Sequence, residues 1–467
     1  MAKAKSDLDV IIMAAGLGTR MKSSTVKILH RAAGRPIIEY VLDLAGSLTD
    51  QPPIMIVGHQ RDRVQEAVGS RARFAVQEEQ LGTGHAVLQA AATSKARRIL
   101  ILSGDVPLTR LETLQNLIGE HERSDNALTV LTMKLDDPAM YGRIVRDGSG
   151  AVTKIVEAKD ASGAEKRIDE VNAGIYVFEA EHLFDNLRNL STTNAQGEYY
   201  LTDLIAVLRK SGHRVGAVVV DDPTEAAGVN SRADLALVEG EIQRRVVANL
   251  MTGGVTFRNP STVVIDSTVT IGNDTVVYPF VTIEGKTRIG SGCVIEPGVH
   301  LIDVTVGDDV HLKTGTVAQE SEIGDEAAVG PYAHLRAGSK LGKHVKVGNF
   351  VETKKAVFGE RAKASHLSYI GDADIGADVN IGAGTITCNY DGVNKHKTVL
   401  EDGVFIGSDT QLVAPVRVGK GAYVGAGSTI TKDVPADSLA LSRTPQKIVD
   451  GWAARKREQQ KAAKKKH

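Results

Sequence analysis

The chain has 467 residues, a formal net charge of −1 and only two cysteines, Cys293 and Cys388. This length is enough for two or more domains, and the near-zero charge gives the protein no overall electrostatic attraction to nucleic acid or a membrane surface. Two cysteines argue against a disulfide framework, and no apolar run approaches the roughly 20 residues that a membrane-spanning helix needs. We therefore expect a soluble, cytoplasmic protein without nucleic-acid or membrane partners.

The first half of the chain alternates between short apolar runs and helical patterns. Apolar runs of strand length occur at residues 10–14, 54–57, 99–102, 127–133, 174–178 and 215–220. Such alternation predicts a mostly parallel sheet wrapped by helices, and the ligands of such folds bind at the carboxyl ends of the strands. We predict an α/β, Rossmann-like domain over residues 1–232.

A glycine-rich loop follows the first predicted strand directly. Residues 14–21 read Ala-Ala-Gly-Leu-Gly-Thr-Arg-Met, and Lys27 follows. Small residues let the backbone lie against a phosphate or a base, while Arg20 and Lys27 add positive charge. The loop is not a dinucleotide fingerprint, because Met21 stands where the third glycine would be, and it lacks the Gly-Lys-Ser/Thr of a P-loop. On these residues alone, a purely structural turn is the alternative.

A carboxylate follows the predicted strand at residues 99–102, in the sequence Ser103-Gly104-Asp105. A carboxylate that a glycine turn delivers to the carboxyl end of a parallel strand is well positioned to hold Mg²⁺ against nucleotide phosphates. For Asp105 alone, a turn or helix-capping role is the alternative.

The loop at residues 14–21, with its following lysine, resembles the signature loop of the sugar-nucleotide pyrophosphorylases. That family usually has a proline before the lysine, where this chain has Val26. Residues 77–86 are similar to the family's nucleobase-binding segment, and residues 141–143, 156–160 and 171–176 to its sugar-binding segments. The residues that this resemblance implies for nucleotide and sugar binding are Met13, Ala14, Ala15, Gly16, Lys27, Gln77, Gly82, Thr83, Ser103, Gly104, Asp105, Gly142, Glu157, Asn172 and Asn230.

The reaction that the resemblance implies is nucleotidyl transfer, in which a sugar 1-phosphate oxygen attacks the α-phosphorus of UTP and pyrophosphate leaves. It implies Mg²⁺ as the cofactor, with Asp105 and Asn230 as its ligands. Lys27 and Arg20 would be catalytic, because their charges neutralise the negative charge that builds up during transfer.

A helical stripe of apolar residues follows the α/β pattern. Its members are Leu235, Val238, Ile242, Val246 and Leu250. Ser231 and Asp234 are spaced as a capping box at its start. We predict a linker helix over residues 233–253.

Aliphatic residues recur six positions apart from about residue 265 to residue 434, and glycine or another small residue follows them. The register includes Ile265, Ile271, Val277, Ile283, Ile289, Ile295 and Leu301, then, after a slip at Val306, Ile323, Val329, Leu335, Leu341 and Val347, and finally Ile406, Leu412, Val418, Val424 and Ile430. This period predicts a left-handed parallel β-helix of hexapeptide repeats, in which three short strands make one coil. We assign it residues 254–467, with a basic tail from Trp452 that we expect to be disordered; a terminal helix or a contact with an anion is the alternative.

Polar clusters interrupt the register at residues 347–356, 363–369 and 388–398. A regular repeat needs only small and aliphatic residues, so these interruptions are candidates for function. An ordinary insertion is the alternative for the last of them, and a satisfied surface or core histidine is the alternative for His366 alone.

In this order, the two halves resemble the bacterial family of bifunctional enzymes that acetylate glucosamine 1-phosphate with acetyl-CoA and couple the product to UTP. The resemblance covers about residues 8–452. It implies that His366 takes a proton from the attacking amine, a role suited to an unperturbed pKa of about 6.5, and that Glu352 orients it. It also implies a homotrimer with the acetyl-transfer site between subunits.

The same resemblance implies two sets of binding residues in the β-helix. Those for glucosamine phosphate are Arg336, Lys354, Tyr369, Asn380 and Lys395. Those for acetyl-CoA are Ala383, Asn389, Tyr390, Ser408, Ala426 and Arg443.

Two alternatives stay open. One is a zinc enzyme resembling a carbonic anhydrase, because His is a common zinc ligand and several histidines lie along the predicted repeats. These are His300, His311, His334, His344 and His366. The other is a uridylyltransferase whose β-helix serves only in assembly. The polar cluster at the register breaks, which includes Lys354 and Asn389, argues against both.

Overall fold

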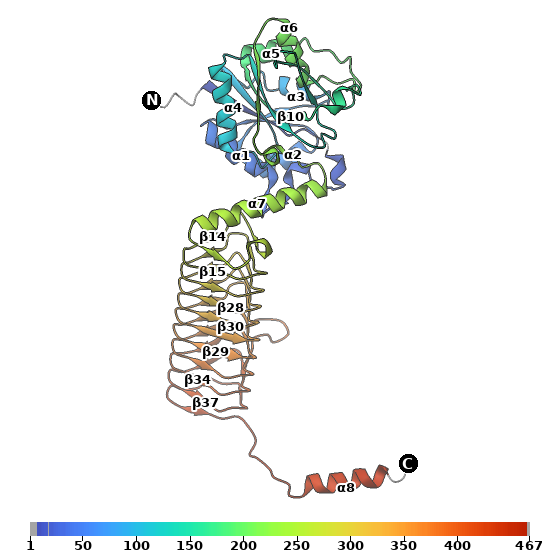
Figure 1. Ribbon diagram of the computed structural model, residues 1–467. Coiled ribbons are helices and arrows are strands. Elements are labelled where there is room, and N and C mark those ends of the chain that lie inside the picture. The colour runs from blue at the N-terminus through green and yellow to red at the C-terminus, as the bar shows by residue number, and fades with distance from the viewer. Residues whose placement is uncertain (1–6, 17, 465–467) are drawn as a thin grey trace. The chain divides into compact units, whose positions relative to one another are not determined.

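The computed structural model describes residues 7–16 and 18–464, and its contacts divide the chain into two compact units, Met1–Val247 and Ala248–His467. Helices and a sheet make up the first unit, and a stack of short strands makes up the second (Figure 1). Leu17 of the glycine-rich loop and residues 465–467 of the basic tail lie outside the described residues. The contact boundary falls inside a helix, so the predicted limits 1–232, 233–253 and 254–467 stay a prediction.

A nine-stranded sheet forms the centre of the first unit, and its main strand order is β11-β7-β10-β6-β1-β4-β5. The strands are β1 (Leu8–Met13), β4 (Ile54–Val57), β5 (Arg73–Val76), β6 (Arg98–Ser103), β7 (Leu128–Lys134), β8 (Arg143–Arg146), β9 (Val152–Val156), β10 (Glu170–Glu179) and β11 (Val215–Val219), with a separate pair β2 (Arg31–Ala32) and β3 (Arg35–Pro36). All six predicted strands are present. The main neighbours are parallel except that β10 runs antiparallel to both β6 and β7.

Helices cover both faces of this sheet. They are α1 (Ile37–Leu48), α2 (Arg61–Val68), α3 (Thr83–Leu88), α4 (Leu111–Arg123), α5 (Ala180–Leu187) and α6 (Leu204–Lys210). Because successive strand residues point to opposite faces, Ile12 belongs to the core cluster under α1 and α4, whereas Ile11 belongs to the cluster under α3, α5 and α6. The predicted α/β fold is confirmed.

Helix α7 (Arg232–Thr252) occupies the segment predicted as a linker helix. Its capping box forms as expected, because the Asp234 carboxylate accepts hydrogen bonds from the Ser231 amide (2.8 Å) and hydroxyl (3.0 Å). Val238 and Ile242 are buried in the core of the first unit. The first part of the helix is therefore packed as a member of the α/β unit.

The second unit is a left-handed parallel β-helix, as predicted. One strand from each coil adds to an eleven-stranded sheet, and the other strands form the remaining faces. The strands are β12 (Thr256–Phe257), β13 (Val264–Ile265), β14 (Thr270–Ile271), β15 (Val276–Val277), β16 (Thr282–Glu284), β17 (Arg288–Ile289), β18 (Val294–Ile295), β19 (His300–Ile302), β20 (Thr305–Val306), β21 (His311–Leu312), β22 (Val317–Gln319), β23 (Glu322–Ile323), β24 (Ala328–Val329), β25 (His334–Arg336), β26 (Lys340–Leu341), β27 (Lys346–Asn349), β28 (Glu352–Phe358), β29 (Lys363–His366), β30 (Tyr369–Ile375), β31 (Asn380–Ile381), β32 (Ile386–Cys388), β33 (Thr398–Leu400), β34 (Phe405–Ile406), β35 (Gln411–Val413), β36 (Val416–Val418), β37 (Tyr423–Val424), β38 (Thr429–Ile430) and β39 (Leu439–Ala440).

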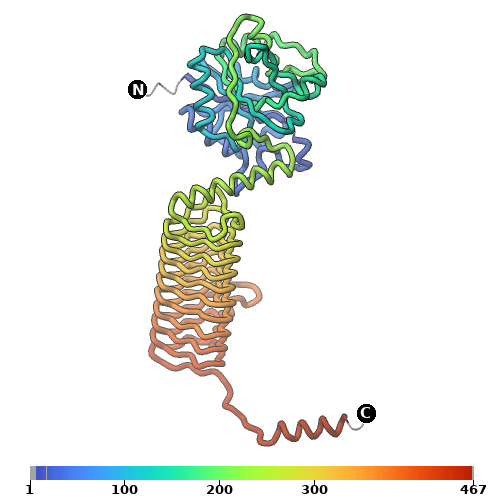
Figure 2. Tube along the Cα trace, viewed as in Figure 1, coloured from blue at the N-terminus to red at the C-terminus, as the bar shows by residue number. Residues whose placement is uncertain are grey.

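The coils of this β-helix are not all of equal length. Ile265 pairs with Ile283 one coil later, whereas Ile289 pairs with Val306, so the second of these coils is the shorter and accounts for the slip in the sequence register. Between Ile381 and its partner Ile406 the coil is longer, because the loop after β32 is inserted there. In the Cα trace one loop stands out from the stack (Figure 2).

The basic tail differs from expectation. Disorder is the first expectation for these residues, but α8 (Trp452–Lys464) is a helix with every residue exposed, which agrees with the alternative. Its Ala, Arg, Lys and Gln residues have high intrinsic helix propensity, which low apolar content does not cancel. Within the described part of the chain, no helix is long and apolar enough to cross a bilayer.

Candidate active sites

A cavity of about 310 Å³ opens at the carboxyl ends of β1 and β6, where the fold predicts a ligand site. The predicted nucleotide-binding residues that line it are Met13, Ala14, Ala15, Gly16, Lys27, Gln77, Gly82, Thr83, Ser103 and Asp105. Gly104 sits in the same turn, where its amide donates to the Met13 carbonyl (2.9 Å). Gln80, which the sequence analysis did not single out, also lines the cavity and donates to the Ala15 carbonyl (2.8 Å).

The wall of this cavity around Gly82 has room only for glycine. Gly82 has φ +110°, and an added Cβ would lie 2.6 Å from the Tyr199 carbonyl oxygen. The side-chain amide of Gln77 donates to the Gly82 carbonyl (3.1 Å), and the Thr83 hydroxyl accepts from the Leu201 amide (3.0 Å). The predicted nucleobase segment is therefore held in place by contacts within the chain.

Two cations and two oxygen ligands meet beside the cavity. The Lys27 ammonium forms a short ion pair with Asp105 and lies 3.3 Å from Asn230 Oδ1, to which Arg20 also donates (2.9 Å). The structure thus brings together four predicted residues that are up to 210 positions apart in the chain. Val26 has φ −56° and ψ 135°, a conformation that a proline at this position would also adopt.

A side-chain oxygen of Asp105 and one of Asn230 point toward the same position, because both contact the Lys27 nitrogen. Carboxylate and amide oxygens are the protein ligands that Mg²⁺ prefers, and Mg²⁺ sites commonly use only one or two protein groups together with substrate phosphates. The donor set therefore fits a divalent cation of this kind.

Among the predicted sugar-binding residues, Glu157 lines a second cavity of about 240 Å³. Glu157 accepts a hydrogen bond from the Thr202 hydroxyl (3.0 Å), and burial raises the pKa of its carboxyl above the ordinary value. An added Cβ on Gly142 would lie 3.4 Å from Glu157 Oε2, and the Asn172 backbone amide donates to the Gly142 carbonyl (2.9 Å). The structure therefore brings these three residues together.

In the β-helix, several predicted residues occupy equivalent positions in successive coils. Asn349 of β27 pairs directly with His366 of β29. Two positions before His366, Ala364 pairs with Ile381 of β31, and the pairing continues in the same register to β34 and β37. The residues along this edge are Asn349, His366, Ala383, Ser408 and Ala426. Arg443 comes one coil further, where its guanidinium donates to the Ala426 carbonyl (2.7 Å). The predicted base and the small acetyl-CoA residues thus share one edge.

The imidazole of His366 is exposed, and its Nδ1 lies 2.6 Å from Asn349 Oδ1. An amide oxygen only accepts hydrogen bonds, so Nδ1 carries the proton and Nε2 of the neutral ring keeps a free lone pair. Glu352 instead accepts a hydrogen bond from Arg336 (2.8 Å) and pairs in register with Tyr369. The prediction that Glu352 orients His366 is therefore wrong within this chain, because the strand register aligns Asn349 with the histidine.

Three cations gather on the face beside this edge. Arg336 and Lys354 are register neighbours, and the nearby charge of Lys395 lowers the pKa of Lys354 below its ordinary value. Two ammonium groups that approach each other repel, and an anion between them would relieve that repulsion. The cluster therefore has the charge that a phosphate group needs.

The inserted loop begins beside the same cluster. Asn389 is buried and donates to Asp372 (2.5 Å), and the hydroxyl of Tyr369 lies with it over Gly371, where an added Cβ would collide with both. Tyr390 is exposed, and its hydroxyl donates to the Gly392 carbonyl (2.6 Å). Asn380 lies on β31 in another sheet than these residues, so the single chain does not bring it to them.

The histidines of the β-helix do not gather. His300 pairs with Glu284, His311 pairs with Glu296 and His344 pairs with Glu326. Over residues 7–16 and 18–464, no group of three or more His, Cys, Asp or Glu side chains could hold a metal ion. The described residues of the single chain therefore offer no ligand set for the zinc alternative.

Fold and sites define the class as a nucleotidyltransferase domain joined to a hexapeptide-repeat transferase. Residues 9–223 match the nucleotidyl transferase family model, residues 260–351 the GMPPB C-terminal domain and residues 397–432 the bacterial transferase hexapeptide (six repeats).

Curated relatives match nearly the whole chain. "Bifunctional protein GlmU" of Trichlorobacter lovleyi is 53% identical over 96% of this chain and 98% of its own length. The proteins of the same name from Pelobacter propionicus and Geobacter sulfurreducens are 51% and 49% identical, over 95% and 97% of this chain and 98% and 100% of their own. The chain belongs to the GlmU family of bifunctional proteins. It is an enzyme with uridylyltransferase and acetyltransferase activities in UDP-N-acetylglucosamine synthesis, and its family generally uses a divalent metal.

Proposed function

We propose that the two activities are divided between the two units, with the residues inferred from the sequence as the working groups of each. The β-helix transfers acetyl from acetyl-CoA to glucosamine 1-phosphate, and the α/β unit then transfers UMP from UTP to the product and releases pyrophosphate. The observation that carries this proposal is that each set of residues gathers within its own unit, one around Lys27 and the other around His366.

In the α/β unit, UTP binds in the cavity at the end of β1 and β6. Gln77, Gly82 and Thr83 contact the uracil, and the loop at residues 13–16 lies against the base and phosphates. Lys27 and Arg20 hold the phosphate oxygens, and their charge stabilises the transition state of an in-line displacement. The further sugar and nucleotide contacts are Ser103, Gly104, Gly142, Glu157 and Asn172.

Asp105 and Asn230 hold the divalent metal, which we propose to be Mg²⁺. When bound together with the substrate phosphates, Mg²⁺ supplies positive charge against the oxygens of the group that is transferred. Because Lys27 contacts both ligands, it lies within reach of the same phosphates.

In the β-helix, Nε2 of His366 takes a proton from the amine of glucosamine 1-phosphate as that amine attacks the thioester carbonyl. The new amide bond forms, the carbon–sulfur bond breaks, and the CoA thiolate leaves and takes up a proton. Asn349 keeps the required tautomer through its hydrogen bond to Nδ1. The cations Arg336, Lys354 and Lys395 bind the sugar phosphate, and Glu352 holds Arg336.

The remaining residues of the β-helix set bind the rest of the two substrates. Small side chains at Ala383, Ser408 and Ala426 leave room for the pantetheine arm along the edge, and Arg443 offers charge to the nucleotide end. Tyr369, Asn389 and Tyr390 surround the sugar and the thioester, and Asn380, which lies in another sheet of the same chain, joins them only in the site completed between subunits.

The active form is a homotrimer in which the acetyl-transfer site is completed between subunits. Support comes from an exposed apolar ridge at one corner of successive coils, formed by Tyr332, Phe350 and Leu367, with the Tyr332 and Phe350 rings stacked 5.8 Å apart. Exposed apolar surface of this kind favours association. Light scattering of the full-length protein should give the mass of three chains, and Phe350→Glu should reduce it; a monomeric wild-type protein would contradict the trimer.

A reciprocal pair of variants tests the division of labour. His366→Ala should abolish CoA release from acetyl-CoA and glucosamine 1-phosphate while pyrophosphate formation from UTP and N-acetylglucosamine 1-phosphate continues. Asp105→Asn should do the reverse. If both variants lost both activities while they remained folded and assembled as the wild type does, the two-site proposal would be wrong. Pyrophosphate formation that survives Asp105→Asn would refute the metal role.

A further inference from the structure

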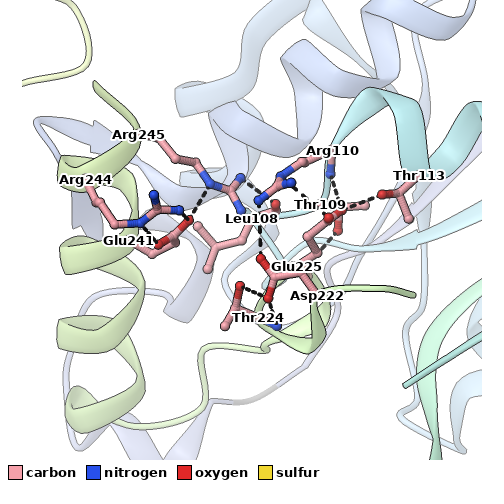
Figure 3. Close-up of polar contacts among 10 residues, drawn as sticks. All are labelled: Leu108, Thr109, Arg110, Thr113, Asp222, Thr224, Glu225, Glu241, Arg244 and Arg245. Carbon is pink, nitrogen blue, oxygen red and sulfur yellow. Dashed lines mark hydrogen bonds and ion pairs between the residues drawn. The ribbon is translucent and has the colours of Figure 1, made fainter. Parts of the chain in front are cut away.

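The loop after β6, which carries Asp105, is held by segments from much later in the chain. The Asp105 carbonyl accepts a hydrogen bond from the Val229 amide (2.9 Å). Three residues further, the Leu108 carbonyl accepts one from the Arg245 guanidinium of α7 (2.7 Å; Figure 3). Residues outside the loop therefore hold it in place, both at the proposed metal ligand Asp105 and three residues after it.

A buried carboxylate holds the far end of the same loop. Glu225, in the 3₁₀ turn η7 (Pro223–Ala226), accepts hydrogen bonds from the Arg110 amide (3.1 Å) and the Thr113 hydroxyl (2.5 Å). Its own carbonyl accepts from the Thr109 hydroxyl (3.0 Å), as Figure 3 shows. A charge-assisted hydrogen bond of this kind is stronger than a neutral one, so the loop has little freedom at residues 108–110.

Arg245 is fixed before it reaches the loop. Its Nε donates to Glu241 one helical turn earlier (2.7 Å), and its side chain is 25% exposed. The rigid guanidinium then presents Nη1 to the Leu108 carbonyl without the loss of freedom that a flexible side chain would incur.

The same helix holds the second proposed metal ligand. At the start of α7, the Asp234 carboxylate accepts the Asn230 amide (3.0 Å) as well as the Ser231 amide (2.8 Å). About three helical turns separate Asp234 from Arg245, and an α-helix keeps such a separation constant. One rigid element therefore contacts the segments of both Asp105 and Asn230.

We propose that Arg245 is a positioning residue for nucleotidyl transfer, and that α7 works as a brace that keeps Asp105 and Asn230 at the separation a divalent cation requires. The proposal rests on the function proposed above for these two residues. Without the Arg245 contact, the loop is still held at Asp105 and at residues 109–110 but no longer at Leu108, and the freedom gained there must be lost again when the cation binds, which weakens binding. Outer contacts that orient metal ligands commonly change metal affinity by about 10- to 100-fold.

The test measures metal binding in the full-length protein. Mn²⁺ binding is measured by electron paramagnetic resonance in the presence of UDP-N-acetylglucosamine. Arg245→Met should weaken this binding by about tenfold. The Mg²⁺ concentration for half-maximal pyrophosphate formation should rise by a similar factor. Arg245→Lys should restore part of the affinity, because an ammonium can still donate to the Leu108 carbonyl.

Arg244 provides the matched control. It also binds Glu241 (2.7 Å), but its side chain is 64% exposed, and in Figure 3 its dashed contacts run to Glu241 rather than to the loop. Arg244→Met should therefore bind Mn²⁺ as the wild type does, and acetyl transfer should be unchanged in all three variants.

Two outcomes would overturn the brace: Mn²⁺ affinity of Arg245→Met equal to that of the wild type, or an equal loss in Arg244→Met. Failure of the underlying function has a different signature. If Asp105→Asn still bound Mn²⁺ and formed pyrophosphate, the metal ligands themselves would be misassigned. If Asp105→Asn lost both while Arg245→Met lost neither, the brace alone would be refuted.

Discussion

The two proposed active sites differ in whether their charged side chains already have partners of opposite charge or polarity. In the α/β unit, Lys27 and Arg20 already contact oxygen groups of the same site, and the cavity is formed by the end of a sheet and its loops. In the β-helix, Lys354 and Lys395 crowd each other on an open face, and His366 projects from an exposed edge. A sheet end can enclose a substrate with its own loops, whereas a solenoid offers flat faces and must interrupt its repeat to build a site.

The largest effect should come from the charged centre of the enclosed site. We expect Lys27→Met to lower kcat for pyrophosphate formation by about 10²- to 10³-fold, because a cation aimed at the transferring phosphoryl group is lost. Acetyl transfer, measured by CoA release, should not change. The matched control is Lys22→Met, which removes an exposed lysine from the same loop. Equal losses in the two variants would point to general electrostatics rather than to Lys27.

On the open edge, the residue to change is Asn349. We expect Asn349→Ala to lower kcat for acetyl transfer by about 10²-fold, because a free imidazole no longer favours the tautomer whose Nε2 can accept a proton. Asn349→Asp keeps an oxygen acceptor beside the histidine and should retain most of the activity. If alanine and aspartate variants behaved alike, the hydrogen bond would have no part in catalysis.

The cation pair predicts a smaller, binding-specific effect. Lys395→Met should raise KM for glucosamine 1-phosphate by about tenfold with little change in kcat, since one of several phosphate contacts is removed. It should also raise the pKa of Lys354 toward its ordinary value, which NMR titration of that side chain can follow. Lys397, which pairs with Asp374 (2.6 Å), is the control lysine of the same loop. A comparable KM change in Lys397→Met would argue against a specific site.

The smallest effect concerns stability and pH. Burial raises the pKa of Glu157 above its ordinary value of 4.5, so the folded chain loses stability as pH rises from 4.5 through the raised pKa. Glu157→Gln removes that loss and can still accept the Thr202 hydrogen bond. We expect the variant to melt at a higher temperature than the wild type at neutral pH, and at the same temperature as the wild type below pH 4.5. A variant that is less stable at neutral pH would contradict this assignment.

The fold of both units could be predicted from the sequence because the apolar residues that form each core follow a clear pattern. The six apolar runs became strands, and the six-residue period became coils. The sheet strands β5, β8 and β9 were missed because their patterns mix polar and apolar residues. Apolar content alone also does not reveal that β10 runs antiparallel to its neighbours. Strand direction depends on connections that span the whole unit.

Site residues could be predicted where they belong to a sequence motif. They could not be predicted where the pairing register between coils determines which side chains become neighbours. Asn349 lies beside His366 because the length of that coil puts the two side chains in register, whereas Glu352 aligns with Tyr369. The length of an individual coil depends on its corner geometry, and a small shift changes which side chains become neighbours. The contact of Arg245 with Leu108 spans 137 positions and leaves no local pattern.

The edge that carries Ala383, Ser408, Ala426 and Arg443 runs toward the last strands of the solenoid, where Leu439 of β39 is 65% exposed. In a stacked repeat each coil is stabilised by its neighbours, so the terminal coils open most readily. The proposed coenzyme contacts are therefore in the least protected part of the stack, while His366 lies several strands deeper. Affinity for acetyl-CoA should then follow the local unfolding equilibrium of the final coils, and bound coenzyme should slow amide exchange there more than around the histidine.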